Sequence, residues 1–265
     1  MKYTCKLSIK VEKDLVEDLV NKIIDQLSFT PDKMDLFFNE FEQPRESLSY
    51  KKSYLLENLS IKQEMEGITS FSLYSKNHLS ENVKPFFRFK ITHLKNSNQL
   101  RCSLEWVAYD KIDQGLLLEK NESMKNILSM SSLIYCYYYD QEDVWEQTNQ
   151  ERDNDSWGRR LTVKGFDFMA APLMYFGKEC DSAIPFNLLS AFSKSKRLQI
   201  KGEEVLKVSL FDINEQADKK ENREAQRMFW ESLELKKLAE DYKSKNKIDF
   251  TAFLKSRAAQ SKRKK

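Results

Sequence analysis

Acidic residues and aromatic rings gather in one stretch of this sequence. Seven carboxylates and a single base, Arg152, lie between residues 140 and 155, so the local charge is −6. Exposed carboxylates steer a basic partner into register, and neighbouring rings supply buried contact area. The residues predicted to contact such a partner are Asp140, Glu142, Asp143, Trp145, Glu146, Asp153, Asp155 and Trp157.

Two plainer interpretations of this stretch stay open. The acids could form a solvated loop that serves solubility alone. The tyrosine run Tyr137–Tyr139, which borders the acids, is more simply interpreted as part of the hydrophobic core.

The end of the chain is basic. Residues 251–265 hold six bases and no acid, which leaves residues 1–250 with +3 − 6 = −3. Lysines and arginines release counterions from phosphates, so the tail offers an alternative function in nucleic-acid association, although it also suits a solubilising terminus or a nuclear address. The bases are Lys255, Arg257, Lys262, Arg263, Lys264 and Lys265.

Most catalytic signatures are missing from the sequence. There is no glycine-rich phosphate loop and no G-x-S-x-G elbow, and only His78 and His93 could act as a histidine base. The segment Asp153–Gly158 matches an EF-hand loop at its first, third and sixth positions but places Trp157 fifth. The sequence therefore predicts no enzyme, no cofactor and no metal, with an acidic-loop metal enzyme as a remote alternative.

The cysteines add no metal or redox motif. Cys5, Cys102, Cys136 and Cys180 are far apart, and no C-x-x-C occurs. They are expected to be buried free thiols in a reducing cytosol. No apolar run reaches 18 residues, and the amino terminus does not resemble a secretory signal, so a cytoplasmic location is expected.

Hydrophobic periodicity predicts the elements of the first half. Alternation over Tyr3–Val11 predicts a strand with one buried face, and three- and four-residue spacing over Leu15–Leu27 predicts an amphipathic helix. A strand over Met34–Phe41 and a helix over Ser53–Leu59 follow. Three strands in series are then expected to form an antiparallel meander covered by the first helix: Ile68–Tyr74, Phe86–His93 and Leu100–Tyr109.

The second half mixes strands with helices. Helices are predicted over residues 121–132 and over Met169–Phe176, where Gly177 would be the C-terminal cap. A last helix is predicted over residues 221–243, with Ala225, Met228, Phe229, Leu233 and Ala239 on its apolar side. The remaining strands are predicted over Leu133–Tyr139, Arg160–Val163 and Glu204–Phe211.

These elements predict an α+β fold, an antiparallel sheet covered by amphipathic helices. The expected organisation is a single compact domain over residues 1–250, with a possible subdivision near 112–120, and a flexible basic tail over 251–265. The oligomeric state stays open.

Several segments of the second half resemble bacterial immunity proteins, the cytoplasmic inhibitors encoded beside polymorphic or secreted toxins. The resemblance covers about a third of the chain and is carried by Tyr138–Gln147, Trp157–Leu161, Gly165–Gly177, Val208–Asp212 and Glu221–Gln226. It implies a non-catalytic protein that inhibits one cognate toxin. Together with the acidic stretch, it predicts a binding protein that covers a basic toxin surface.

Overall fold

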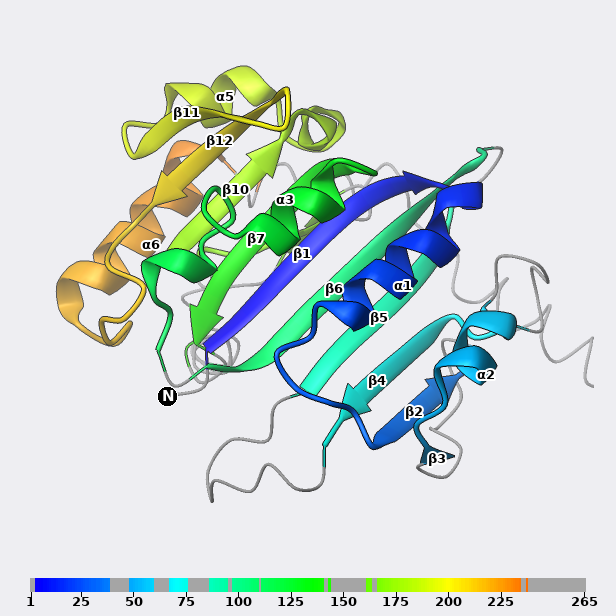
Figure 1. Cartoon of the computed structure of the whole chain (residues 1–265). Coiled ribbons are helices and arrows are strands. Elements are labelled where there is room, and N and C mark those ends of the chain that lie inside the picture. Colours follow the sequence, from blue (N-terminus) through cyan, green and yellow to red (C-terminus); the bar gives the residue numbers. More distant parts are fainter. Residues whose placement is uncertain are drawn as a thin grey trace, which may run out of the picture.

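The chain folds around one open antiparallel sheet. The computed structural model describes residues 3–38, 48–59, 67–75, 86–94, 97–109, 111–140, 143, 161–163, 166–234 and 237. Ten strands form the sheet in the order β11-β12-β10-β7-β1-β6-β5-β4-β2-β3 (Figure 1). The architecture is broadly α+β and is dominated by the sheet, as the sequence predicted in outline.

The first strand lies in the middle of the sheet. β1 (Tyr3–Glu12) pairs with β6 (Gln99–Tyr109) on one side and with β7 (Ser132–Asp140) on the other. The prediction of one buried face was wrong, because Thr4, Lys6 and Ser8 are buried as well as the apolar residues between them. A central strand loses solvent on both faces when its neighbours and the layers above and below surround it.

The predicted meander is present. β4 (Ser70–Tyr74), β5 (Phe86–His93) and β6 are consecutive neighbours, and β2 (Lys33–Phe37) and the two-residue β3 (Leu48–Ser49) continue the sheet to its edge. The register aligns apolar side chains in a row across the strands. That row contains Leu36, Phe71, Phe89, Leu104 and Leu7.

Helices cover the face that bears this row, which we call the first face. α1 (Val16–Asp25) follows a short 3-10 turn, η1 (Lys13–Leu15), and buries Val16, Leu19, Val20, Ile23 and Ile24 in the same core. α3 (Glu122–Leu128) lies beside α1 on this face, and α2 (Lys52–Glu57) lies nearer the β3 edge (Figure 1). The Asn121 side chain caps α3 by accepting the Met124 N–H at 3.2 Å.

The segment after residue 168 differs from its prediction. Met169–Phe176 was expected to be a helix, but Leu173–Gly177 forms strand β10, which pairs with β7 and β12 (Glu203–Ser209). Every β10 residue is buried. The sequence therefore lacks the alternation of polar and apolar residues that would indicate a strand. Gly177 therefore ends a strand and is the N-cap residue of the 3-10 helix that follows, Lys178–Ser182, so the predicted role as a C-terminal helix cap was wrong.

Three strands were not predicted at all, namely β3, β9 (Phe166–Phe168) and β11. β11 (Ser195–Ile200) forms the other edge of the sheet, where β12 is its neighbour among the described strands. The two strands are joined by Lys201 and Gly202, both with positive φ (50° and 85°), the geometry of a two-residue hairpin turn. Lysine and arginine on this edge disfavour pairing with further strands.

The helix predicted over residues 221–243 is present in its first part, and Ala225, Phe229 and Leu233 lie on its core side as expected. Residues 235, 236 and 238–243, with Ala239, lie outside the described residues. α6 covers Lys220–Ser232, and Glu234, with φ of 48°, lies just beyond it. Met228 was expected on the apolar side but is 54% exposed. The buried residues of α6 are Asn222, Gln226, Phe229 and Trp230.

A second core lies on the opposite face, over β7, β10 and β12. Phe229 of α6 stacks on Phe176, which contacts Tyr137 edge to face. The 3-10 helix η5 (Lys178–Ser182) and α5 (Phe186–Ala191) complete this side, and β8 (Leu161–Val163) with β9 (Phe166–Phe168) forms a separate hairpin. Within the described residues, no helix is long and apolar enough to cross a membrane.

Candidate binding surfaces

The predicted acidic surface begins where β7 ends. Asp140 is the last residue of β7 and lies opposite Tyr3 at the start of β1. Burial first, and then the charges of Asp140 and Asp212, raise the pKa of the Tyr3 hydroxyl. Asp212 comes from the loop between β12 and α6, so this end of the sheet collects carboxylates from two distant parts of the sequence.

Asp143 has a different place from the one predicted. It was expected to be an exposed contact residue, but it is 3% exposed. Its carboxylate accepts hydrogen bonds from Arg223 and, at 3.0 Å, from the Gln226 amide. A buried carboxylate needs such partners to offset its lost hydration, so Asp143 serves as an internal anchor.

This anchor links three parts of the second half. Gln226 also donates to the Ala170 carbonyl at 2.9 Å, and Arg223 donates to the Gln226 side-chain oxygen at 2.9 Å. The start of the acidic stretch is thereby attached to α6 and to the segment that precedes β10. The sequence offered no signal for this network beyond the helical spacing of Arg223 and Gln226.

The other predicted site residues lie outside the described residues. These are the remaining members of the acidic stretch and the basic tail: Glu142, Trp145, Glu146, Asp153, Asp155, Trp157, Lys255, Arg257, Lys262, Arg263, Lys264 and Lys265. The three tyrosines beside the stretch are buried, Tyr138 in the first core and Tyr137 and Tyr139 in the second. The interpretation of the tyrosine run as core is confirmed.

A second charged network was missed by sequence reasoning. Glu119 accepts hydrogen bonds from the Tyr175 hydroxyl and, at 2.6 Å, from the Lys207 ammonium. Burial alone would raise the pKa of Glu119, but the hydrogen bonds from Lys207 and Tyr175 outweigh it and hold that pKa below its usual value. The three residues attach the segment after η2 (Gln114–Leu116) to strands β10 and β12.

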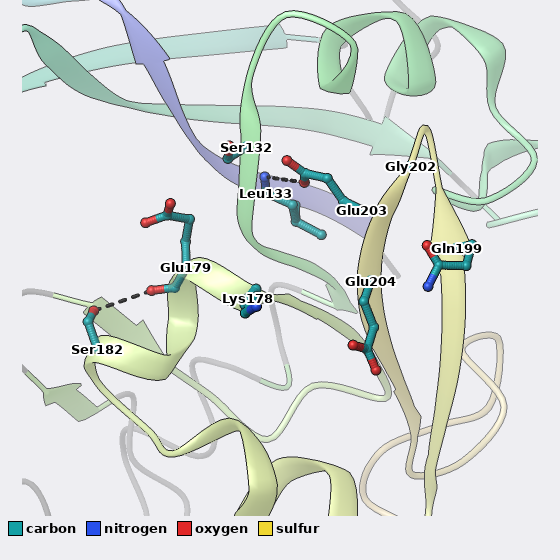
Figure 2. A pocket seen from close by; sticks show the side chains of 9 residues that line it. All are labelled: Ser132, Leu133, Lys178, Glu179, Ser182, Gln199, Gly202, Glu203 and Glu204. Atoms are coloured by element: carbon teal, nitrogen blue, oxygen red, sulfur yellow. Dashed lines mark hydrogen bonds between the residues drawn. The ribbon is translucent and has the colours of Figure 1, made fainter.

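A polar pocket lies at the end of β7 opposite Asp140. Figure 2 shows it between the start of β7, helix η5 and the β11–β12 turn. The volume of the pocket is about 630 Å³. Three of its lining residues are carboxylates and one is an ammonium. The lining comprises Ser132, Leu133, Lys178, Glu179, Ser182, Gln199, Gly202, Glu203 and Glu204.

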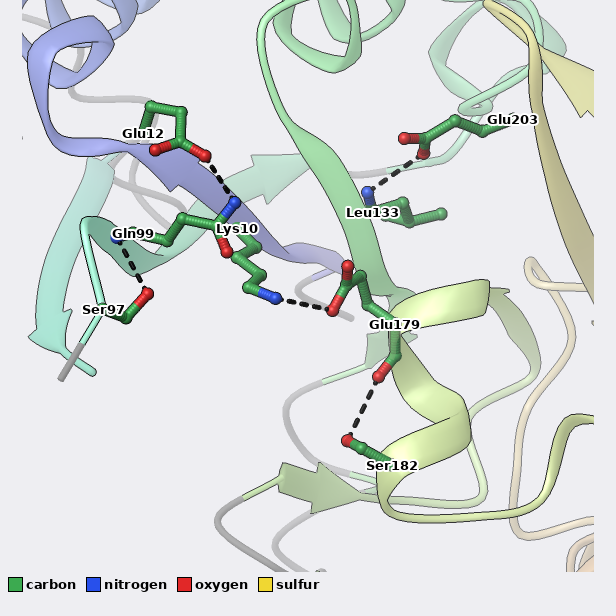
Figure 3. A network of polar contacts seen from close by, with 8 residues as sticks. All are labelled: Lys10, Glu12, Ser97, Gln99, Leu133, Glu179, Ser182 and Glu203. Atoms are coloured by element: carbon green, nitrogen blue, oxygen red, sulfur yellow. Dashed lines mark hydrogen bonds and ion pairs between the residues drawn. The ribbon is translucent and has the colours of Figure 1, made fainter. Parts of the chain in front are cut away.

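Each of the three carboxylates accepts a hydrogen bond, and the donor to Glu204 is Arg197. Glu203 accepts the Leu133 N–H at 3.3 Å, and Lys10 of β1 donates to Glu179 at 3.1 Å (Figure 3). In Figure 2 the side chains of Glu179 and Glu203 approach the start of β7 from opposite sides. Sequence reasoning missed this pocket because its residues come from three segments of the chain, namely the start of β7, helix η5 and the β11–β12 hairpin.

The four thiols lie in the interior of the protein. All four cysteines are buried and free, and the sulfur atoms of Cys5 and Cys136 lie 3.7 Å apart. Burial raises the pKa of the Cys136, Cys102 and Cys180 thiols. Over the described part of the chain, no group of three histidine, cysteine, aspartate or glutamate residues is placed to hold a metal ion.

Comparisons with known proteins give distant likenesses in structure and none in sequence. No protein-family model matches the chain, and no curated protein matches it in sequence. Among solved structures, the chain is similar to the Pseudomonas aeruginosa T6SS protein PA0821, with 9% sequence identity. The match covers 88% of this chain and 72% of that one, with a TM-score of 0.44, and a likeness at this level carries no argument about function.

Proposed function

We propose that this chain is a non-catalytic binding protein of the immunity type, which acts in the bacterial cytoplasm and neutralises a toxin by covering a basic surface on it. The observation that carries the proposal is the anchoring of Asp143 to Arg223 and Gln226. A strongly acidic, ring-bearing stretch starts at this anchored point. A fixed attachment reduces the entropy lost when the stretch meets a partner.

The charge around the attachment supports the same partner. Asp140 and Asp212 lie close enough to Tyr3 to raise its pKa, so they add to the negative potential at this end of the sheet. Surface potentials of one sign raise the rate of encounter with a partner of the opposite sign, and salt screens them. Association with the toxin should therefore slow as ionic strength rises.

Co-expression with a candidate toxin tests the proposal. The candidate is the C-terminal domain encoded next to this chain's gene, provided that it arrests growth when expressed alone. Wild-type chain should restore growth and should co-purify with that domain. The double variant Glu142→Gln with Glu146→Gln should protect less and associate more slowly, because it removes two of the steering charges.

The matched control removes two charges from another surface. Asp14 and Asp18 are exposed at the start of the first helix, and their replacement by asparagine should leave protection unchanged. Asp143 is unsuitable for this comparison because its removal would disturb folding. Equal protection by both double variants would contradict the acidic stretch as the contact surface, and a failure of wild-type chain to bind or protect would contradict the function.

A further inference from the structure

We infer that the pocket at the start of β7 binds a basic side chain, an arginine or a lysine, presented by a protein partner. The inference rests on the proposed function, since it names a second contact for a basic partner. Leu133 is the one apolar residue of the lining, whereas pockets for apolar small molecules are lined mainly by hydrophobic side chains. The pocket therefore fits a polar, charged group.

The positive charge that we infer for the ligand rests on Glu203, because Glu179 and Glu204 already pair with Lys10 and Arg197. Glu179, Glu203 and Glu204 face a single ammonium, Lys178, so the lining residues carry −2. At Glu179 and Glu204 an incoming cation would have to compete with the existing ion pairs.

Glu203 differs from the other two carboxylates. Its hydrogen-bond partner is the Leu133 backbone N–H, and no cationic side chain of the described residues lies within ion-pair distance of it. A carboxylate has about four acceptor positions, and one N–H uses only one of them. Glu203 can therefore accept a guanidinium or ammonium group without breaking an existing ion pair.

The walls of the pocket are built on paired strands. Glu203 is the first residue of β12, which pairs with β10 and β11, and Leu133 lies in β7 beside β1. Gly177 at the end of β10 approaches Leu133 so closely that an added Cβ would lie 1.9 Å from its carbonyl oxygen. Side chains supported by such elements lose little freedom when a ligand binds.

The pocket is separate from the acidic end of the sheet. Ser132 and Asp140 are the first and last residues of β7, which places the two surfaces roughly 27 Å apart at about 3.4 Å per residue. Charge changes at one surface should therefore have little effect on the other. This separation allows the pocket to be tested without the toxin.

The test is an NMR titration of the full chain with N-acetyl-arginine N-methylamide. Amide resonances of Leu133, Gly202 and Glu203 should shift saturably with this probe. The citrulline analogue, which has nearly the same shape and no charge, should produce no such shift. Glu203→Gln keeps an acceptor for the Leu133 N–H and should weaken binding of the arginine probe by about tenfold.

Two controls protect the result against misfolding and general charge effects. The midpoint of urea unfolding should be the same for Glu203→Gln as for wild type. Asp212→Asn, at the far end of the sheet, should bind the arginine probe as tightly as wild type. The inference is overturned if both probes shift the same resonances equally, if Glu203→Gln binds like wild type, or if no saturable shift occurs up to roughly 50 mM probe. The titration measures binding of the probe and does not measure toxin protection. A failure of the pocket inference is therefore distinguishable from a failure of the proposed function.

Discussion

Arg223 of α6 donates a hydrogen bond to the buried carboxylate of Asp143, which lies 80 residues earlier in the chain. The side chains are 12% and 2% exposed, so the ion pair is almost completely removed from water. Gln226, one helical turn further along α6, satisfies the second carboxylate oxygen. The acidic stretch thus starts from a point whose position depends on α6.

Removal of the Asp143 carboxylate should destabilise the fold strongly. Asp143→Ala leaves the Arg223 charge and the Gln226 amide without their shared partner, so we expect a loss of about 3 kcal/mol in the free energy of unfolding. Urea unfolding followed by circular dichroism measures this change. Replacement of both ionic partners, Asp143→Leu with Arg223→Met, should cost less than the sum of the two single changes.

An exposed ion pair on the same helix serves as the control. Arg227 pairs with Glu224 and Glu231 on the solvent side of α6. Solvent screens such pairs, so Glu224→Gln should leave the urea midpoint nearly unchanged. A midpoint shift equal to that of Asp143→Ala would show that burial does not govern the strength of these pairs.

The Glu119 network predicts a pH dependence of stability. The pKa of Glu119 is lower in the folded chain than its ordinary value of 4.5, so the ionised form stabilises the fold. This contribution is fully present above pH 4.5 and is lost as the pH falls through the lower, folded pKa. At pH 7, Glu119→Gln should cost about 2 kcal/mol through weaker hydrogen bonds with Lys207 and Tyr175.

The predicted signature is the difference between wild type and Glu119→Gln across pH. That difference should be constant between about pH 7 and pH 5 and should shrink below pH 4.5. Urea unfolding at several pH values measures it. A difference that grows on acidification would contradict the arrangement, because it would require a raised carboxylate pKa in the folded state.

Two glycines should respond differently to alanine. At Gly177 a new Cβ would lie 1.9 Å from the Leu133 carbonyl oxygen, so β10 and β7 must separate, and we expect a loss of about 3 kcal/mol or more. At Gly202 a Cβ meets nothing within 4 Å, and only the positive φ opposes the change, at about 1 kcal/mol. Thermal unfolding of the two variants compares them, and equal stability would contradict the close approach of β10 to β7.

The four thiols should be inert in the folded protein. All are buried, and burial raises the pKa of Cys136, Cys102 and Cys180, so thiolate is scarce near neutral pH. Ellman's reagent at about pH 8 should modify the native chain only as fast as it unfolds, and should titrate four thiols in urea. Rapid reaction of one native thiol would show that it is accessible.

The sequence by itself determined those elements in which the buried residues recur at the regular spacing of a strand or of a helix. β5 and β6 bury one face and leave the other mostly half-buried, and α1 has an apolar stripe, so alternation and helical spacing located all three. The tyrosine run beside the acidic stretch was also correctly interpreted as core, because large rings bury a large apolar area.

Only the tertiary structure decided the rest, because burial there depends on neighbours that are distant in sequence. β10 is buried on both faces, so its residues show no period that separates a strand from a helix. Met228 and Phe229 are both apolar, and the packing of α6 on Phe176 determined which of them is covered. Asp143 is acidic and was expected at the surface, yet Arg223 and Gln226 hold it inside, since a buried charge is stable only where partners from elsewhere in the chain meet it.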